Sequence, residues 1–268
     1  MIKLVASDLD GTLLQKRAQS LETDVFELIR ELKELGILFV AASGRQYANM
    51  YKMFEPVVND IAFISENGGV AVYKDKVLYQ DAFDMELALD IAKCINERDG
   101  AEFTCSTKDF YYICPKTEHF RDLMLNVVGN VCKDIKNLDE IIEPCMKLAV
   151  YEPDANQDET IQYWNERFGN RCTVVTSGNA WVDFIPFGTN KARGLEIYQK
   201  LLKIKPDECM VFGDEYNDIA MLKSSPYSFA MSHAKQGVKD VAAYETDKVQ
   251  TILRKLIAAK GNIEEVVG

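Results

Sequence analysis

Two aspartates near the start of the chain have the type and spacing of a metal-assisted catalytic pair. Residues 7–12 read SDLDGT and follow the apolar run Ile2–Ala6, and Gly11 allows the tight turn that brings Asp8 and Asp10 together. A hard divalent cation such as Mg²⁺ relieves the repulsion between two such carboxylates. One carboxylate can then act as a nucleophile and the other as an acid–base group. A turn with two solvated acids is the alternative that this segment alone leaves equally open.

A second acidic segment also directly follows an apolar run. Residues 213–218 read GDEYND and follow the run Cys209–Phe212, at a point where a helix can begin. Taken alone, Asp214 and Asp218 are also typical of acids that favour the positive end of a helix dipole. If the two acidic segments face each other across a sheet, their carboxylates build a metal site. The pair of segments is therefore far more specific than either one.

Two further places in the chain could bind an anion such as a phosphoryl group. Ser43 and Gly44 follow the apolar run Ile37–Ala42, and a hydroxyl beside exposed backbone N–H groups forms an anion cradle. An N-cap serine with its glycine is the plainer interpretation of this pair. Lys191 stands at a predicted helix start, where a cation opposes the helix dipole. Neutralising a phosphoryl group would explain a lysine at that position.

All of these polar segments, apart from Lys191, follow short apolar runs, which predicts how they are positioned. The runs are Ile2–Ala6, Ile37–Ala42, Ile61–Ile64, Cys209–Phe212 and Tyr227–Met231. Such runs are typical of strands covered on both faces, as in a parallel sheet. Amphipathic helices are predicted over 25–35, ended by Gly36, and over 249–257. The alternation predicts a Rossmann-like, doubly wound α/β core with ligands at the carboxyl ends of its parallel strands.

The middle of the chain, residues 82–186, differs in amino-acid composition from the rest and is predicted to be a second α/β domain. It contains most of the cysteines, both tryptophans and several aromatic-rich strand candidates. Inserted between the third and fourth predicted core strands, it leaves a discontinuous core of residues 1–81 and 187–268. Its predicted strands are Asp109–Ile113, Met146–Tyr151, Cys172–Thr176 and Trp181–Ile185, and its predicted helices are Glu86–Arg98, His119–Val128 and Gln157–Phe168.

Composition disfavours several classes of function. The 268 residues include 31 Lys and Arg against 42 Asp and Glu, and the net charge of −11 repels phosphate backbones and anionic membranes. Aspartates interrupt the N-terminal apolar run, so we expect a cytoplasmic protein without a signal peptide. Seven cysteines without a CxxC pair predict reduced thiols, and two histidines exclude a histidine-rich metal centre. We expect no nucleic-acid or membrane partner, and a monomer or weak homo-oligomer.

Four segments, in this order, resemble the motifs of haloacid dehalogenase (HAD) superfamily phosphatases. They are DLDGT at 8–12, ASGR at 42–45, Lys191, and GDEYND at 213–218. The long insertion, ENGG at 66–69 and PFG at 186–188 resemble the Cof-like sugar-phosphatase branch, in which the insertion is a large α/β cap. The resemblance covers the whole chain. It implies a Mg²⁺-dependent phosphomonoesterase acting on small phosphorylated metabolites. Sugar phosphates are the leading expected substrates, and FMN and pyridoxal phosphate rank after them.

The resemblance also implies a role for each site residue. Asp8 is similar to the nucleophile that forms an aspartyl-phosphate, and Asp10 to the group that protonates the leaving oxygen and then activates water. Phosphate is then held by Asp8, Leu9, Ser43, Gly44, Lys191 and Asn217. Mg²⁺ is held by the Asp8 carboxylate, the Asp10 carbonyl and Asp214, with Glu215 and Asp218 supporting the metal or its waters. These roles fit phosphoryl transfer, which depends mostly on positioning and charge neutralisation.

Substrate specificity is expected to come from the cap, which would close over the site. Arg45 and Asn67, on predicted core loops, are candidate substrate contacts. They rank above the cap residues Tyr111, Tyr112, His119, Trp181 and Asp183, for which ordinary packing is the plainer interpretation. Ser232 and His233 stand where the family usually has Gly-Asn, and the role of His233 stays open between substrate contact and a surface loop.

Two other functions remain as alternatives. A phosphomutase or phosphotransferase of the same superfamily would share the aspartyl-phosphate but pass the phosphoryl group to a second hydroxyl. A non-catalytic sensor of phosphometabolites would keep the fold without the reaction. The presence of Asp8, Asp10, Lys191 and Asp214 disfavours a sensor, because a pure binder needs no nucleophile.

Overall fold

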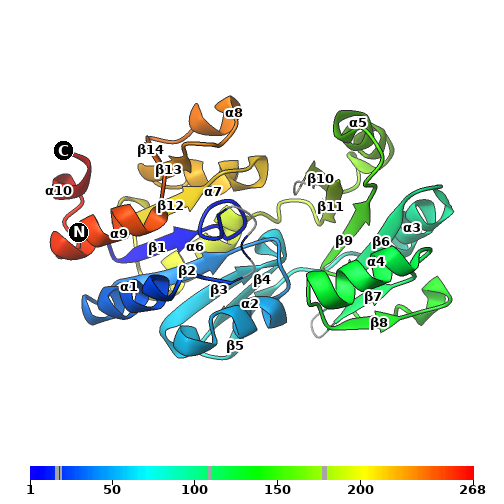
Figure 1. The fold of residues 1–268 in the computed structure, drawn as a ribbon, viewed down its shortest axis with the longest axis horizontal. Coiled ribbons are helices and arrows are strands. Elements are labelled where there is room, and N and C mark those ends of the chain that lie inside the picture. The colour runs from blue at the N-terminus through cyan, green and yellow to red at the C-terminus, as the bar shows by residue number, and fades with distance from the viewer. Residues whose placement is uncertain (16–17, 19, 108–109, 177–179) are drawn as a thin grey trace. The chain divides into compact units, whose positions relative to one another are not determined.

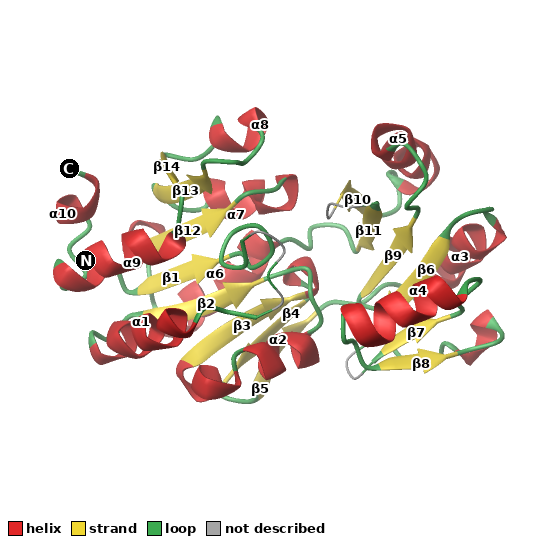
Figure 2. Ribbon diagram, in the orientation of Figure 1, coloured by secondary structure: helices red, strands yellow, loops and turns green. Residues whose placement is uncertain are grey.

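The computed structural model describes residues 1–15, 18, 20–107, 110–176 and 180–268 (Figures 1 and 2). The chain forms two compact units. The first, here called the core unit, contains Met1–Gly44, Met50–Tyr79 and Asn190–Gly268. The second, here called the inserted unit, contains Arg45–Asn49 and Gln80–Thr189.

The core unit is built on an eight-stranded sheet with the order β14-β13-β12-β1-β2-β3-β4-β5. Its parallel strands are β1 (Leu4–Ser7), β2 (Leu38–Ala42), β3 (Ile61–Ser65), β12 (Cys209–Gly213), β13 (Tyr227–Met231) and β14 (Tyr244–Thr246). A hairpin of β4 (Val70–Tyr73) and β5 (Lys76–Gln80) extends it, with β4 antiparallel to β3. The chain winds outward from β1 in one direction and from β12 in the other, so the topological switch point lies between these two strands.

Helices cover both faces of this sheet, because alternate strand residues point to opposite sides. On one face, Leu4, Ala6 and Val211 pack with α6 (Lys191–Leu202), α7 (Ile219–Lys223) and α8 (Gln236–Lys239). In Figure 1, α1 (Thr23–Glu34) and α9 (Val249–Ala258) lie in front of the sheet, and the short helices α2 (Tyr47–Met53) and α10 (Glu264–Val267) complete the set. Gly36, with φ 73°, follows α1 as the sequence predicts.

The inserted unit has its own six-stranded sheet, with the order β10-β11-β9-β6-β7-β8. The strands are β6 (Glu102–Ser106), β7 (Tyr111–Ile113), β8 (Cys132–Asp134), β9 (Lys147–Tyr151), β10 (Thr173–Thr176) and β11 (Trp181–Ile185). All of its pairs are antiparallel except β7 with β8. Helices α3 (Met85–Glu97) and α5 (Gln157–Phe168) pack their apolar residues against one face of this sheet to form its core.

The predicted α/β class is confirmed, and the five predicted core strands begin and end within two residues of the observed ones. The hairpin β4–β5 and the strands β6, β8 and β14 were not predicted. The predicted helix His119–Val128 is a short α4 (Glu118–Asp122) followed by a π-helical turn, Leu123–Val127. The predicted strand Asp109–Ile113 begins at Asp109, which lies outside the described residues, and β7 covers Tyr111–Ile113.

All seven cysteines are free thiols. Within the described ranges, none of the helices combines the length and the apolar character that crossing a membrane requires.

Candidate active site

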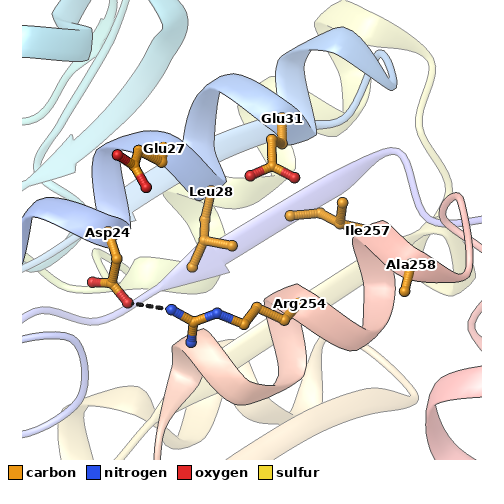
Figure 3. A pocket seen from close by; sticks show the side chains of 7 residues that line it. All are labelled: Asp24, Glu27, Leu28, Glu31, Arg254, Ile257 and Ala258. Atoms are coloured by element: carbon orange, nitrogen blue, oxygen red, sulfur yellow. Dashed lines mark hydrogen bonds and ion pairs between the residues drawn. The ribbon is translucent and has the colours of Figure 1, made fainter.

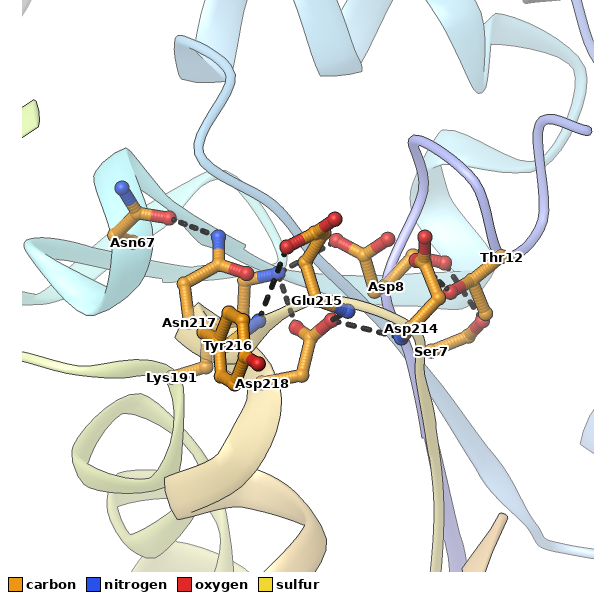
Figure 4. A network of polar contacts seen from close by, with 10 residues as sticks. All are labelled: Ser7, Asp8, Thr12, Asn67, Lys191, Asp214, Glu215, Tyr216, Asn217 and Asp218. Carbon is orange, nitrogen blue, oxygen red and sulfur yellow. Dashed lines mark hydrogen bonds and ion pairs between the residues drawn. The ribbon is translucent and has the colours of Figure 1, made fainter. Parts of the chain in front are cut away.

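The two acidic segments meet at the topological switch point of the core sheet (Figure 4). Asp8 follows β1 directly, and its backbone N–H donates to the carbonyl of Phe212 in β12 over 3.0 Å. Asp214 follows the end of β12, so parallel pairing brings the two loops to one edge. One carboxylate oxygen from each of Asp8, Asp214 and Asp218 lies within 4.8 Å of the others.

Lys191 is the cation at the centre of this acidic cluster. It begins α6 and is completely buried, with its Nζ 2.5 Å from Asp8 Oδ1 and 2.6 Å from Asp218 Oδ1. Burial lowers the pKa of Lys191, but the two carboxylates outweigh it, so the pKa lies above its ordinary value. The ammonium is therefore charged, and its unusual place at a helix start is explained by these two ion pairs.

Asp8 combines burial with one unused oxygen. Burial raises the pKa of Asp8 well above its ordinary value, the Lys191 ammonium opposes this, and the neighbouring carboxylates add to it. Its Oδ1 is held by Lys191, whereas Oδ2 is buried without a hydrogen-bond partner among the described residues. A buried acceptor without a partner costs about 1–3 kcal/mol, so this oxygen suits a ligand that the folded chain alone does not supply.

Asp214 is held in place by the turn that follows Asp8. The Thr12 hydroxyl donates to Asp214 Oδ1 over 2.6 Å. Gly11 has φ 95°, and a Cβ atom there would lie 2.1 Å from Asp214 Oδ2, so only glycine lets this carboxylate pack against the turn. Burial raises the pKa of Asp214 to about 6, against the effect of the Thr12 hydrogen bond.

Asp218 organises the loop after β12. Its Oδ2 accepts hydrogen bonds from the backbone N–H groups of Asp214, over 3.0 Å, and Glu215, over 3.1 Å. Its Oδ1 is paired with Lys191. Both oxygens of Asp218 are thus engaged by the protein, which makes it a support for the loop and for the lysine.

The segment after β2 lies against the turn after β3. The backbone N–H of Ser43 donates to Ile64, and the Ser43 carbonyl accepts from the backbone N–H of Asn67 over 3.1 Å. Asn217 Nδ2 donates to Asn67 Oδ1 over 3.1 Å. Ser43, Gly44 and Asn217 are thereby linked through one turn of the core unit.

Other predicted site residues lie outside the cluster of three carboxylates. Asp10 is exposed and forms a β-bridge with Leu14, and Leu9 between the two aspartates is fully buried. Glu215 lies 3.9 Å from Lys235. Arg45 belongs to the inserted unit, where its guanidinium donates to Asn49 over 3.1 Å. His233 Nε2 lies 3.6 Å from Asp214 Oδ2, and its side chain is 54% exposed.

The candidate substrate contacts of the inserted unit have local partners. Tyr112 is buried in the apolar core of that unit and donates to Glu143. Trp181 packs on Tyr151 in a second apolar cluster. Asp183 lies 3.5 Å from Lys147 as a buried ion pair.

Tyr111 belongs to the same second cluster as Trp181, and His119 is exposed in α4.

Thr12 and Asp218 are the functional positions whose contacts sequence reasoning missed. Thr12 was visible only as the last residue of DLDGT, and its bond to Asp214 joins residues 202 positions apart. For Asp218, the signal was its spacing of four from Asp214, because a short 3₁₀ turn, Tyr216–Asp218, brings Asp218 back to the backbone N–H of Asp214.

Asp8 and Asp214, supported by Asp218, form a carboxylate cluster that fits a hard divalent cation. Carboxylate oxygens are the ligands that such cations prefer. Three buried carboxylates face one ammonium, and Asp8 Oδ2 has no hydrogen-bond partner in the described part of the chain. A divalent cation would offset this buried negative charge.

A pocket elsewhere on the core unit has a different character (Figure 3). It lies between α1 and α9, and its lining includes Asp24, Glu31 and Arg254. Arg254 is already paired with Asp24 over 2.5 Å. The remaining acidic lining does not suit a phosphorylated ligand, and none of the strand-end residues described above contributes to it.

The chain matches known proteins over nearly its whole length. A family model described as haloacid dehalogenase-like hydrolase matches residues 5–251. The Escherichia coli protein YbjI, a 5-amino-6-(5-phospho-D-ribitylamino)uracil phosphatase, is 32% identical over 247 residues, which are 91% of this chain and 90% of that protein. A putative phosphatase of Streptococcus pyogenes is 27% identical over 264 residues, 91% of this chain and 93% of its own.

Solved structures share the fold. A Streptococcus mutans protein, SMU.1108c, superimposes with a TM-score of 0.86 at 25% identity, covering 96% of this chain and 100% of its own. A haloacid dehalogenase-like hydrolase of Bacteroides thetaiotaomicron gives a TM-score of 0.84 at 20% identity, over 96% and 100% of the two chains. The resemblance inferred from the four motifs is confirmed, and the chain belongs to the haloacid dehalogenase-like hydrolase family.

Proposed function

We propose that this protein is a Mg²⁺-dependent phosphomonoesterase that hydrolyses small phosphorylated metabolites through an aspartyl-phosphate on Asp8. The single observation that carries the proposal is the buried Asp8 carboxylate, which has one oxygen on Lys191 and the other without a partner among the described residues. The Lys191 ammonium opposes the effect of burial and favours the ionised carboxylate, whose lone pairs are available for attack.

In the first half of the reaction, an oxygen of Asp8 attacks phosphorus in line with the ester oxygen. The new bond joins the carboxylate to phosphorus, the bond from phosphorus to the ester oxygen breaks, and Asp10 protonates the leaving oxygen. Ser43, together with backbone N–H groups of Leu9 and Gly44, would donate to the phosphoryl oxygens. Lys191 balances their charge, as phosphoryl transfer requires.

In the second half, Asp10 accepts a proton from a water molecule whose oxygen attacks phosphorus. The bond between phosphorus and Asp8 breaks, and inorganic phosphate is released with Asp8 regenerated. Asp10 is exposed, which suits a group that exchanges protons with solvent between the two halves.

Mg²⁺ would be held by the carboxylates of Asp8 and Asp214 and by the carbonyl of Asp10. When bound, it neutralises negative charge on the phosphoryl group. Asp218 supports this set from outside, because its own oxygens hold Lys191 and two backbone N–H groups. We assign Glu215 the same role of supporting the metal ligands.

We assign the choice of substrate to the inserted domain, residues 82–186. The YbjI relative and a Bacillus subtilis relative, YcsE, at 25% identity, are both named as 5-amino-6-(5-phospho-D-ribitylamino)uracil phosphatases. Phosphorylated ribitylamino-pyrimidines therefore stand first among substrates to try, followed by sugar phosphates, FMN, pyridoxal phosphate and phosphoglycolate.

The test measures release of inorganic phosphate from this panel by wild type, with Mg²⁺ and with a chelator, beside Asp8→Asn. Asp154→Asn, at an exposed position of the inserted unit, is the matched control. We expect metal-dependent release that Asp8→Asn abolishes and Asp154→Asn keeps. Acid quenching with a labelled substrate should trap label on the wild-type chain and none on Asp8→Asn.

Two outcomes would overturn the proposal. Transfer of label to a sugar hydroxyl instead of water would identify a phosphotransferase. Tight binding of a panel compound without any phosphate release, at every metal concentration, would identify a phosphometabolite sensor.

A further inference from the structure

A short turn after β3, Glu66–Gly68, contacts three of the loops that carry the candidate site. The backbone N–H of Asn67 donates to the Ser43 carbonyl over 3.1 Å, and its side chain accepts from Asn217 Nδ2 over 3.1 Å. At Gly68, a Cβ atom would lie 2.0 Å from the carbonyl oxygen of Asn190, which precedes Lys191. One turn thus lies against the loops after β2 and β12 and against the start of α6.

The backbone of this turn is left-handed at three successive residues. The φ angles are 52° at Glu66, 55° at Asn67 and 101° at Gly68. Asparagine and glycine adopt this region at little cost, whereas glutamate does so with strain of the order of 1 kcal/mol. All three residues are buried, so the packing around them holds the turn in this conformation.

The carboxamide of Asn67 lies between two groups that are assigned to phosphate binding. A Cβ atom at Gly44 would lie 2.9 Å from Asn67 Oδ1, so the carboxamide packs directly on the backbone of that glycine. The same oxygen accepts the hydrogen bond from Asn217. Asn217 then keeps one N–H, and its Oδ1 is buried without a partner among the residues that the structure describes. A side chain fixed in advance loses less rotamer freedom when a ligand arrives.

We propose that Asn67 is a positioning residue for phosphate recognition, which acts by fixing the carboxamide of Asn217. The proposal rests on the function proposed above for this site and differs from a direct contact of Asn67 with the substrate. It makes the turn Glu66–Gly68 a fifth element of the site, beside the four motif segments.

The test is a double-mutant cycle of Asn67→Gly and Asn217→Ala, read by calorimetric titration with inorganic phosphate in the presence of Mg²⁺. Glycine keeps the left-handed backbone and the N–H that Ser43 accepts, and removes only the carboxamide. We expect each single change to weaken phosphate binding about three- to tenfold, as the loss of one hydrogen bond predicts. The double variant should bind about as weakly as Asn217→Ala alone, because Asn67 then has nothing to position.

Asn67→Asp is the rescue variant. It keeps an acceptor for Asn217 Nδ2 and tolerates a left-handed backbone, so Asn217→Ala should keep its full effect in this background. The negative charge that Asn67→Asp introduces lowers phosphate affinity equally in the presence and in the absence of Asn217→Ala. Its effect therefore cancels when the affinities of these two proteins are compared. In the Asn67→Gly background, by contrast, Asn217→Ala should have little further effect.

Asp75→Gly is the matched control, because Asp75 has φ 59° on an exposed turn away from the site. It should leave phosphate binding unchanged, and thermal unfolding shows that each variant is folded. The proposal would be overturned if the two single-variant losses of phosphate affinity multiply in the double variant. Phosphate binding by Asn67→Gly within twofold of wild type would overturn it as well. If wild type binds phosphate but hydrolyses no substrate, the proposed function fails while the binding cycle still decides the role of Asn67.

Discussion

Lys191 Nζ lies 2.5 Å from Asp8 Oδ1 although the two residues are 183 positions apart in the chain. The lysine is fully buried and is shared with Asp218. Removing one member of such a cluster leaves uncompensated charges in the interior, which costs far more than the intact pair contributes. The ion pair therefore joins the stability of the core unit to the chemistry of its site.

Lys191→Met should lower both stability and activity. In metal-free protein we expect the free energy of unfolding to fall by about 3–5 kcal/mol, because Asp8 and Asp218 lose the cationic partner that they share. With Mg²⁺ present, kcat/KM should fall at least about 100-fold, since the charge that faces the phosphoryl group is gone. Urea unfolding and steady-state kinetics measure the two effects.

Lys200→Met is the matched control for this change, because Lys200 lies on the same helix, is exposed and forms a surface ion pair with Glu196. It should change stability by less than about 0.5 kcal/mol and leave kcat/KM unaltered. Equal losses in the two variants would contradict a special role for the buried pair.

Gly11→Ala should weaken metal binding through Asp214. Besides adopting φ 95°, the new residue would place its methyl group 2.1 Å from Asp214 Oδ2 and displace that carboxylate. We expect the dissociation constant for Mg²⁺ to rise at least about tenfold, as for other changes that disturb the support of a ligand. Gly36→Ala is the control, since Gly36 has φ 73° and no atom of the described residues beyond its chain neighbours lies within 4 Å of the added methyl group.

Both alanine variants carry the strain of a left-handed backbone, about 1–2 kcal/mol. Their Tm values should therefore fall together, while only Gly11→Ala loses affinity for Mg²⁺ in a calorimetric titration. Unchanged metal affinity in Gly11→Ala would remove Asp214 from the proposed ligand set.

The pKa of Asp214 makes the stability of the metal-free protein depend on pH. Burial raises this pKa to about 6, whereas the pKa of an aspartate in an unfolded chain is about 3.9. Between these values the folded protein binds more protons than the unfolded chain, so the free energy of unfolding falls as pH rises. Lowering the pH from about 7 to about 5 should therefore stabilise the folded state, by about 1 kcal/mol from this group.

Asp214→Asn should lack that gain. Urea unfolding of both proteins in chelator, at the two pH values, gives the difference in which the other titrating groups cancel. The same gain in wild type and variant would show that Asp214 is not the group whose protonation is linked to folding.

The sequence was most informative where local patterns combine with parallel pairing. The apolar runs before Asp8 and Asp214 indicate buried parallel strands, and such strands end at one edge of a sheet, so the meeting of the two loops follows from topology. The predicted place of Lys191 at a helix start is also confirmed, because α6 begins at this residue.

The contacts that fix individual side chains lay beyond sequence reasoning. Thr12 with Asp214, and Asp218 with Lys191, depend on where distant loops come to lie, which no local pattern encodes. The hairpin β4–β5 was missed because β5 is mostly exposed and carries no buried apolar run. The expected helix over 119–128 was interrupted by a π-helical turn, which the apolar spacing does not distinguish from an α-helix.

Asp10→Asn should separate the two halves of the proposed reaction. An amide can neither donate a proton to the leaving oxygen nor accept one from water, so both steps slow. A substrate whose leaving group is already acidic, such as p-nitrophenyl phosphate, needs no proton in the first half, so only hydrolysis of the phosphoenzyme stays slow.

Rapid mixing of Asp10→Asn with this substrate should then give a burst of about one p-nitrophenolate per chain, followed by a slow steady rate. If the phosphoryl group is labelled, the label should be retained on Asp8 after acid quenching. Wild type should show a smaller burst, because its second half is faster, and Asp8→Asn should release no p-nitrophenolate. A steady slow rate without a burst, and without label on the chain, would contradict the assignment of Asp10 as the base for water.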